Sequence, residues 1–174
     1  FQMAREEGFD DVNMDLIAAL PGETVDVFAK SLEKVMALAP ESVTVHALAI
    51  KRSSRLHLEH APLPPAELAA EMVRMGPATA AELGMRPYYL YRQKYMSGGF
   101  ENVGWSVPGA ESLYNICMME ELHTIVSLGG GGVTKLVDRA TGYIERLANA
   151  KYPQEYIQKI DAICADKARV AQFY

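Results

Sequence analysis

The sequence predicts an α/β fold, and two observations lead to this class. Residues 12–20 (VNMDLIAAL) and 42–50 (SVTVHALAI) are short apolar runs, typical of strands that are buried on both faces. Between them, apolar side chains recur at helical spacing from Val25 to Leu38. A strand, a helix and a second strand in this order form a crossover unit, so the two strands should lie parallel in one sheet.

The next elements extend the same pattern. Thr24 is placed to cap the first helix, because its hydroxyl can accept from a free amide of the first turn. A second helix is expected over 66–83, and the Gly76-Pro77 pair should kink or break it, since an interior proline costs about 3 kcal/mol. Residues 87–95 (PYYLYRQKY) form a third strand candidate. This strand is consistent with another strand–helix step in the same sheet.

From residue 96 the composition changes, because glycines interrupt the chain at short intervals. A final helix should start at Pro153, a residue well suited to a first helical turn. The sequence thus divides into a first part over 1–95 and a smaller α+β extension over 96–174. Three more strand candidates lie in the second part: 114–120, 124–128 and 143–147.

Bulk properties limit the partners of the protein. The net charge of −5 argues against broad nucleic-acid binding, which uses a basic face. No apolar run reaches the roughly 18–20 residues that span a bilayer, and no signal peptide opens the chain. We therefore expect a cytoplasmic protein with neither a membrane nor a nucleic-acid partner. Its two cysteines, Cys117 and Cys164, are expected to be buried free thiols and do not make a metal site.

Several spaced motifs then point to a family. Residues 13–24 (NMDLIAALPGET) form a strand and turn, and 42–56 continue into the next strand and a basic loop. Further motifs lie at 88–94 (YYLYRQK), 101–104 (ENVG) and 114–121 (YNICMMEE). In this order they resemble the oxygen-independent coproporphyrinogen III oxidases, the coproporphyrinogen dehydrogenase subgroup of the radical S-adenosylmethionine (SAM) superfamily. The resemblance covers nearly the whole chain.

The resemblance implies a fold and a reaction. The chain would be the C-terminal portion of a partial (β/α) barrel of the radical SAM type, with residues 1–95 as the C-terminal half of the barrel. The family oxidatively decarboxylates two propionates of coproporphyrinogen III to the vinyl groups of protoporphyrinogen IX in haem biosynthesis. A 4Fe–4S cluster, held by three cysteines of a C-x₃-C-x₂-C loop, cleaves SAM to a 5′-deoxyadenosyl radical. No cysteines of this chain have that spacing, so the cluster ligands are expected in a missing N-terminal half.

The resemblance also carries candidate SAM-binding residues. Asp15 stands at the family position that contacts SAM, and a carboxylate at the end of a barrel strand can accept from ribose hydroxyls or pair with the amino group. Ala49 matches a position whose backbone lies against SAM. Leu128, Gly129 and Gly130 belong to a glycine loop that contacts SAM in the family. The alternatives are an aspartate that caps a turn, a core alanine and a flexible loop.

Substrate contacts are expected from the basic loop after the second strand. Lys51, Arg52 and Arg55 could bind the carboxylates of a tetrapyrrole, because arginine holds a propionate through two hydrogen bonds. A solvated run of surface charge is the alternative. His46 is interpreted as a core or barrel-facing histidine rather than a catalyst. Two residues depart from the family pattern: Ala19 and Gly132 stand where relatives usually carry Gly and Ala.

Three functions remain open from the sequence. The first is an enzyme portion that supplies SAM and substrate contacts but no cluster. The second is a haem chaperone of the same superfamily branch, and the third is a barrel fragment without activity of its own. The strand at 12–20 would also leave an apolar edge open, through which isolated chains could associate.

Overall fold

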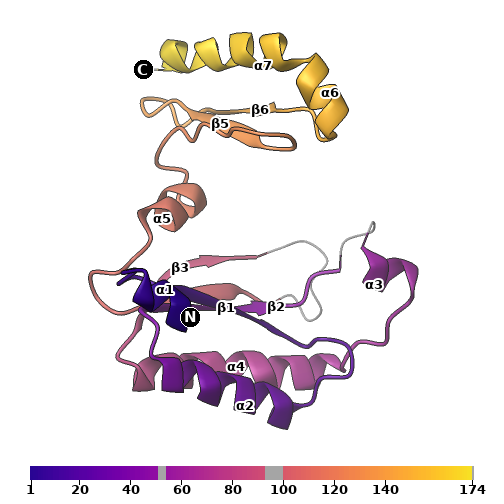
Figure 1. Cartoon of the computed structure of the whole chain (residues 1–174), viewed down its shortest axis with the longest axis vertical. Coiled ribbons are helices and arrows are strands. Elements are labelled where there is room, and N and C mark those ends of the chain that lie inside the picture. Colours follow the sequence, from indigo (N-terminus) through magenta and orange to yellow (C-terminus); the bar gives the residue numbers. More distant parts are fainter. Residues whose placement is uncertain (51–53, 93–99, 174) are drawn as a thin grey trace. The chain divides into compact units, whose positions relative to one another are not determined.

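A computed structural model describes residues 1–50, 54–92 and 100–173 of the protein. The chain folds into two compact units, Phe1–Ser112 and Leu113–Tyr174, and each is considered by itself. The first unit is built on one four-stranded sheet, and its elements are labelled in Figure 1. They are α1 (Gln2–Glu6), β1 (Asn13–Ala18), α2 (Val25–Leu38), β2 (Ser42–Ala47), α3 (Arg55–Leu58), α4 (Ala66–Glu82), β3 (Arg86–Tyr91) and β4 (Asn102–Ser106).

The predicted strand–helix–strand unit is present. β1 and β2 pair in parallel, with Asn13 opposite Ser42 and Ala18 opposite Ala47. Thr24 caps α2 as expected, because its hydroxyl accepts from the backbone amide of Val27 at 3.3 Å. The mixed α/β class with a parallel strand pair is therefore confirmed.

The sheet departs from the prediction at its other edge. Its strand order is β1-β2-β4-β3, and β4 runs antiparallel to both neighbours. β3 thus belongs to the same sheet and runs in the direction of β2, but the expected direct parallel step is wrong because β4 lies between them. Residues 92–101 are fewer than the dozen or so that a parallel crossover needs, so β3 and β4 form an antiparallel pair.

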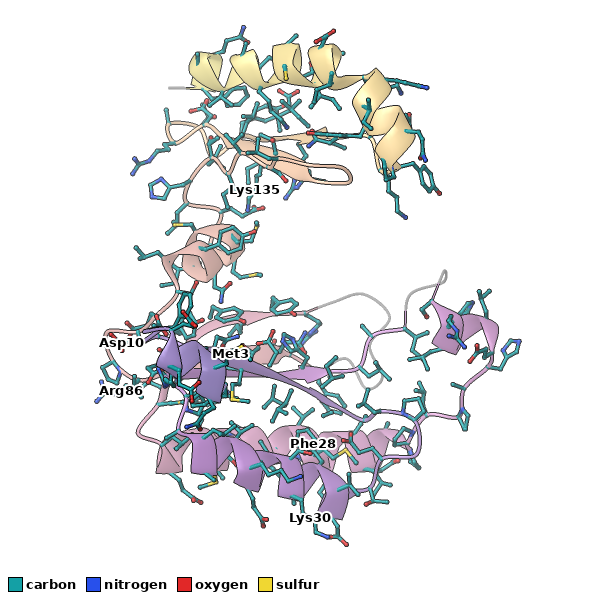
Figure 2. The ribbon with its side chains drawn as sticks, in the orientation of Figure 1. Met3, Asp10, Phe28, Lys30, Arg86 and Lys135 are labelled. Carbon is teal, nitrogen blue, oxygen red and sulfur yellow. The ribbon has the colours of Figure 1, made fainter. Side chains whose placement is uncertain are left out.

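Helices α2 and α4 lie side by side along one face of the sheet (Figure 1). In Figure 2, Phe28 points from α2 toward the sheet, whereas Lys30 points away from it. Phe28 and Met72 are at most 1% exposed and pack with the inward-facing residues of β1 and β2. This apolar layer is the core of the first unit, and it leaves the opposite face of the sheet for polar side chains.

α4 continues through Pro77, so the expected break is wrong. The helix packs closely on the sheet at this point: a Cβ atom on Gly76 would lie 3.0 Å from Cγ2 of Val45. Tertiary packing of the Ala- and Met-rich face therefore holds the helix together across the proline.

The second unit consists of a hairpin and short helices. A helix replaces the strand expected at 114–120, and 124–128 makes only one isolated bridge, from Ile125 to Lys135, whereas the strand expected at 143–147 is present as β6. β5 and β6 pair antiparallel. The elements are α5 (Leu113–Met119), β5 (Val133–Val137), β6 (Ile144–Ala148), α6 (Pro153–Gln158), α7 (Ile160–Lys167) and the 3₁₀ helix η2 (Ala168–Phe173).

The division between the units lies after Ser112 rather than at the expected 95/96. The reason is β4, which the sequence analysis placed in the extension but which pairs with two strands of the first sheet. The cysteines also differ from expectation: both are free, but Cys117 is half-buried and Cys164 is exposed. No helix of the described residues is long and apolar enough to cross a membrane.

Candidate functional site

A hollow lies where the parallel strands β1 and β2 end. Ligands of α/β folds bind at the carboxyl ends of parallel strands, so this is the expected place for a site. Its volume of about 350 Å³ falls in the range of small-molecule sites. The hollow is lined by Asp15, Ile17, His46, Ala47, Leu48, Ala49 and Tyr91.

Asp15 presents its carboxylate on the polar face of the sheet. Its side chain is 57% exposed, and Nε2 of His46 lies 3.5 Å from Oδ2. Asn13 donates from Nδ2 to Oδ1 at 2.7 Å. The contact with Nε2 of His46 lowers the pKa of Asp15 most strongly, and Asn13 and Thr44 add to this lowering against the opposing effect of burial. Asp15 is therefore an ionised acceptor at neutral pH.

Two tyrosine rings of β3 form an aromatic wall along the polar face of the sheet. Tyr89 and Tyr91 stack nearly parallel, with ring centroids 6.2 Å apart and an interplanar angle of 6°. The hydroxyl of Tyr89 is hydrogen-bonded to Oγ1 of Thr44 at 3.0 Å, and burial raises the pKa of Tyr89. The ring of Tyr89 lies over Gly104, where only a glycine leaves room for it. Packing and hydrogen bonding together fix the wall.

The other predicted residues of the first unit have different environments. Ala49 lines the same hollow as Asp15, so the structure brings these two together. Lys51 and Arg52 lie outside the described residues. Arg55 has an 89% exposed side chain and is paired with Glu59 one helical turn away, at 3.0 Å. This ion pair is what a solvated surface charge would also make, so substrate contact by the basic loop stays a prediction.

The glycine loop belongs to the second unit. Gly129 has a positive φ of 88°, donates its amide to the hydroxyl of Tyr156 at 3.3 Å and accepts at its carbonyl from Nδ2 of Asn149 at 2.7 Å. Leu128 is 83% exposed, and Gly130 is exposed beside it. The loop is therefore tied to α6 and to the end of β6, while the side chain of Leu128 is accessible.

The two departures from the family pattern have structural consequences. Ala19 adopts a positive φ of 69°, a conformation that costs an alanine about 1 kcal/mol more than a glycine. A Cβ atom on Gly132 would lie 2.2 Å from Oγ of Ser127 and 3.2 Å from the carbonyl oxygen of Leu128. Gly132 thus sits in a tight turn, where an alanine would require Ser127 to move.

Sequence reasoning missed the roles of two residues at the hollow. The expectation of a core or barrel-facing His46 named no partner for it, whereas Nδ1 of His46 is hydrogen-bonded to the Tyr91 hydroxyl at 2.9 Å. Asn102 is also new: it is 1% exposed and accepts from the backbone amide of Ala47 at 2.9 Å. Strand alternation was an available signal, since Asp15 and His46 both belong to the sheet face opposite the core.

The cysteines of this chain do not fit an iron–sulfur cluster. Three thiolates are needed by the family motif, and the chain has only Cys117 and Cys164, one in each of two different helices. Among the described residues, no group of three His, Cys, Asp or Glu side chains could hold a metal ion. No step of cluster chemistry is therefore assigned to this chain.

No family model matches the chain. It is 42% identical over 171 residues to the oxygen-independent coproporphyrinogen-III oxidase-like protein HemZ of Bacillus subtilis, covering 97% of this chain and 34% of HemZ. It is 28% identical over 160 residues to the haem chaperone HemW of Mycobacterium tuberculosis, covering 87% of this chain and 35% of HemW.

Among solved structures, coproporphyrinogen III oxidase (HemN) of Escherichia coli, described as a radical SAM enzyme, matches with a TM-score of 0.62 at 18% identity. The match covers 92% of this chain and 36% of that one. This likeness shows the fold. The chain spans about a third of the length of these relatives, rather than the expected half.

Asp15 lies within β1, and it lines a hollow at the carboxyl ends of the parallel pair β1 and β2 together with Tyr91 of β3. This edge of an α/β sheet is where ligands of such folds commonly bind. The similarities to HemZ and HemN narrow this α/β unit to one group of proteins. The chain is homologous to part of the coproporphyrinogen III oxidase-like radical SAM proteins of the HemZ and HemN type.

Proposed function

We propose that this chain supplies SAM and substrate contacts for the oxidative decarboxylation of coproporphyrinogen III to protoporphyrinogen IX, in the cytoplasm. The supporting observation is Asp15, an ionised carboxylate that lines the hollow and whose side chain is 57% exposed. The similarity to HemZ and the HemN fold is the second support. The cluster and the N-terminal portion of the barrel would complete the enzyme.

The residues of the hollow fit SAM by their chemistry. SAM carries hydroxyl and ammonium donors, and Asp15 offers acceptor oxygens to them. Ala49 has a short side chain, which lets a ligand approach the backbone at the end of β2. SAM, when bound and reduced by a cluster, supplies the radical that starts the oxidation. The part of this chain is to bind and orient it.

The proposal extends to the remaining predicted contacts. Leu128, Gly129 and Gly130 would contribute a backbone contact to SAM, as the family resemblance implies. Lys51, Arg52 and Arg55 would bind propionates of the tetrapyrrole. For Arg55 this requires exchange of the Glu59 carboxylate for a substrate carboxylate, which its exposure allows.

The test uses a protein of the relatives' full length that contains this chain, reconstituted with iron and sulfide. Asp15→Asn should weaken SAM binding, measured by equilibrium dialysis, by about 10- to 100-fold, because a hydrogen bond to a charged group contributes about 1.5–3 kcal/mol. Asp10→Asn, an exposed aspartate before β1, is the matched control and should leave the affinity unchanged. Equal affinities of the wild type and Asp15→Asn would refute the assignment.

A haem chaperone is the second candidate, and the similarity to HemW favours it. The same reconstituted protein decides between the two. Vinyl formation from coproporphyrinogen III would support the oxidase. Stoichiometric haem binding without vinyl formation would support the chaperone and refute the oxidase.

A further inference from the structure

At the hollow, three side chains from three strands form a chain of polar contacts. Oδ2 of Asp15 on β1 lies 3.5 Å from Nε2 of His46 on β2. Nδ1 of the same ring is hydrogen-bonded to the hydroxyl of Tyr91 on β3 at 2.9 Å. The Tyr91 side chain reaches His46 across β4, since Tyr91 pairs with Asn102 of that strand. Both ring nitrogens of His46 are therefore engaged.

The chemistry of the partners fixes the tautomer of His46. An ionised carboxylate can only accept hydrogen bonds, so Nε2 must carry the hydrogen that faces Asp15. In a neutral imidazole Nδ1 is then the acceptor, and the Tyr91 hydroxyl donates to it. The opposite tautomer would turn the lone pair of Nε2 toward a negative charge. The Asp15 carboxylate thus selects this ring form, and the Tyr91 hydroxyl stabilises it by donating to Nδ1.

The carboxylate of Asp15 is held on both sides. His46 faces Oδ2, while Asn13 donates to Oδ1 and is itself held by a hydrogen bond from Ser42 to its Oδ1 at 3.1 Å. Each carboxylate oxygen can accept a second hydrogen bond. Because the side chain is 57% exposed, the lone pairs that His46, Asn13 and Thr44 leave unused are available to a ligand.

The far end of this chain of contacts is anchored as well. The ring of Tyr91 stacks on Tyr89, and Tyr89 is hydrogen-bonded to Thr44. Tyr91 also meets His46 edge-on, with ring centroids 6.0 Å apart. These contacts restrict the hydroxyl of Tyr91 to a position within reach of Nδ1.

We propose that His46 and Tyr91 are positioning residues for ligand binding: Tyr91 holds His46 in its Nε2–H tautomer, and His46 orients the Asp15 carboxylate toward donors of the ligand in the hollow. The inference rests on the proposed function only for the identity of that ligand, SAM. The contact at 3.5 Å is longer than a good hydrogen bond and should shorten when the ligand binds, as contacts in unfilled sites commonly do.

The tautomer can be measured without any ligand. Long-range ¹H–¹⁵N correlation spectra of the chain, at a pH where the imidazole is neutral, should show His46 with a protonated Nε2 and an unprotonated Nδ1. Tyr91→Phe should shift the Nδ1 resonance, because it removes the donor. The inference would be overturned if Nδ1 of His46 were protonated in the wild type. It would also be overturned if the ¹⁵N chemical shift of Nδ1 were the same in the wild type and in Tyr91→Phe.

Affinity measurements test the effect on binding. In the reconstituted full-length protein, His46→Phe should weaken SAM binding about tenfold and Tyr91→Phe about threefold. Tyr91→Phe should add little to His46→Phe, because the two act through one contact. His123→Phe, an exposed histidine of the second unit, is the control. Circular dichroism checks that each variant is folded.

The two proposals fail in different ways. If Asp15→Asn leaves the SAM affinity unchanged, the proposed function fails, while the tautomer measurement still decides the His46–Tyr91 arrangement. If Asp15→Asn weakens binding but His46→Phe does not, Asp15 needs no orientation by His46 and the positioning role is refuted.

Discussion

Gly104 on β4 provides a sharp test of how the polar face is built, and the perturbation is Gly104→Ala. A Cβ atom at this position would lie 1.8 Å from Cε1, 2.4 Å from Cδ1 and 2.7 Å from Cζ of Tyr89. No rotation of a methyl group can relieve contacts to a ring at these distances. Gly104 is not among the residues with positive φ, so the backbone itself accepts an alanine and the ring of Tyr89 must move.

The expected change in the free energy of unfolding follows from the contacts that the ring of Tyr89 would lose. Overpacking of a fixed ring costs about 1–3 kcal/mol, and loss of the hydrogen bond from Tyr89 to Thr44 adds about 1 kcal/mol. Alanine in a strand regains roughly 0.5–1 kcal/mol over glycine. We therefore expect a decrease of about 2 kcal/mol in the free energy of unfolding of the first unit.

Urea unfolding followed by tryptophan fluorescence measures this decrease. The single tryptophan of the chain, Trp105, neighbours Gly104 and packs against the core of the first unit. A loss of 2 kcal/mol should lower the urea midpoint by about 1 M. In a Tyr89→Ala background the same change should cost nothing or stabilise. An unchanged midpoint, or an equal cost in both backgrounds, would refute the reasoning.

Other predictions concern separate parts of the molecule. Burial raises the pKa of Glu41, but hydrogen bonds from the Val12 amide and from Arg5 outweigh it and hold that pKa below its ordinary 4.5. The resulting stabilisation is complete above pH 4.5 and is lost as pH falls toward the folded-state pKa. Glu41→Gln should lower stability at neutral pH and flatten the acid limb of a thermal-melting profile; an unchanged acid limb would contradict this. Pro77→Ala should stabilise α4 by about 1–3 kcal/mol through a restored backbone hydrogen bond, seen as a higher urea midpoint, and a lower midpoint would show that the proline ring is needed for packing. Nζ of Lys167 donates a hydrogen bond to Oγ1 of the buried Thr134 at 2.5 Å, and Lys167→Met removes this bond. Hydrogen exchange of the backbone amides of β5 and β6 should therefore accelerate. Unchanged exchange would show that the bond contributes nothing to the stability of the second unit.

The first strand–helix–strand unit could be predicted because its signals are local. Thr24 caps the helix, apolar spacing sets its buried face, and β-branched residues mark β2. β4 could not be found in this way, because Gly104 interrupts its pattern. That glycine is explained only by Tyr89 from another strand, which is a long-range contact.

The second unit shows a different reason for error. The segment 114–120 contains Tyr, Ile and Cys residues that favour strands, yet the chain forms α5 at Leu113–Met119. A helix of seven residues is too short to display a clear periodicity, so composition alone misleads. In α4 a helix was expected to break and does not, because packing against the sheet outweighs the effect of the proline.

Motifs pointed to Asp15 and Ala49 as candidates, and the structure places both at one hollow, while their contact with SAM stays a prediction. The link from His46 to Tyr91 could not, because it depends on the register of three strands and on β4 lying between two of them. Sequence periodicity gives the face of a residue but not its partner across a sheet.

The two faces of the sheet in the first unit differ in role: one packs on the apolar core, and the other carries the polar side chains of the hollow. Phe28 and Met72 are held against one side of it, while Asp15, His46 and Tyr91 stand on the other and take no part in that apolar layer. An exposed residue such as Asp15 can therefore be exchanged at a smaller cost in stability than the buried Phe28 or Met72. Such an arrangement lets one scaffold diverge in ligand choice, which accords with oxidase-like proteins and haem chaperones both being relatives of this chain.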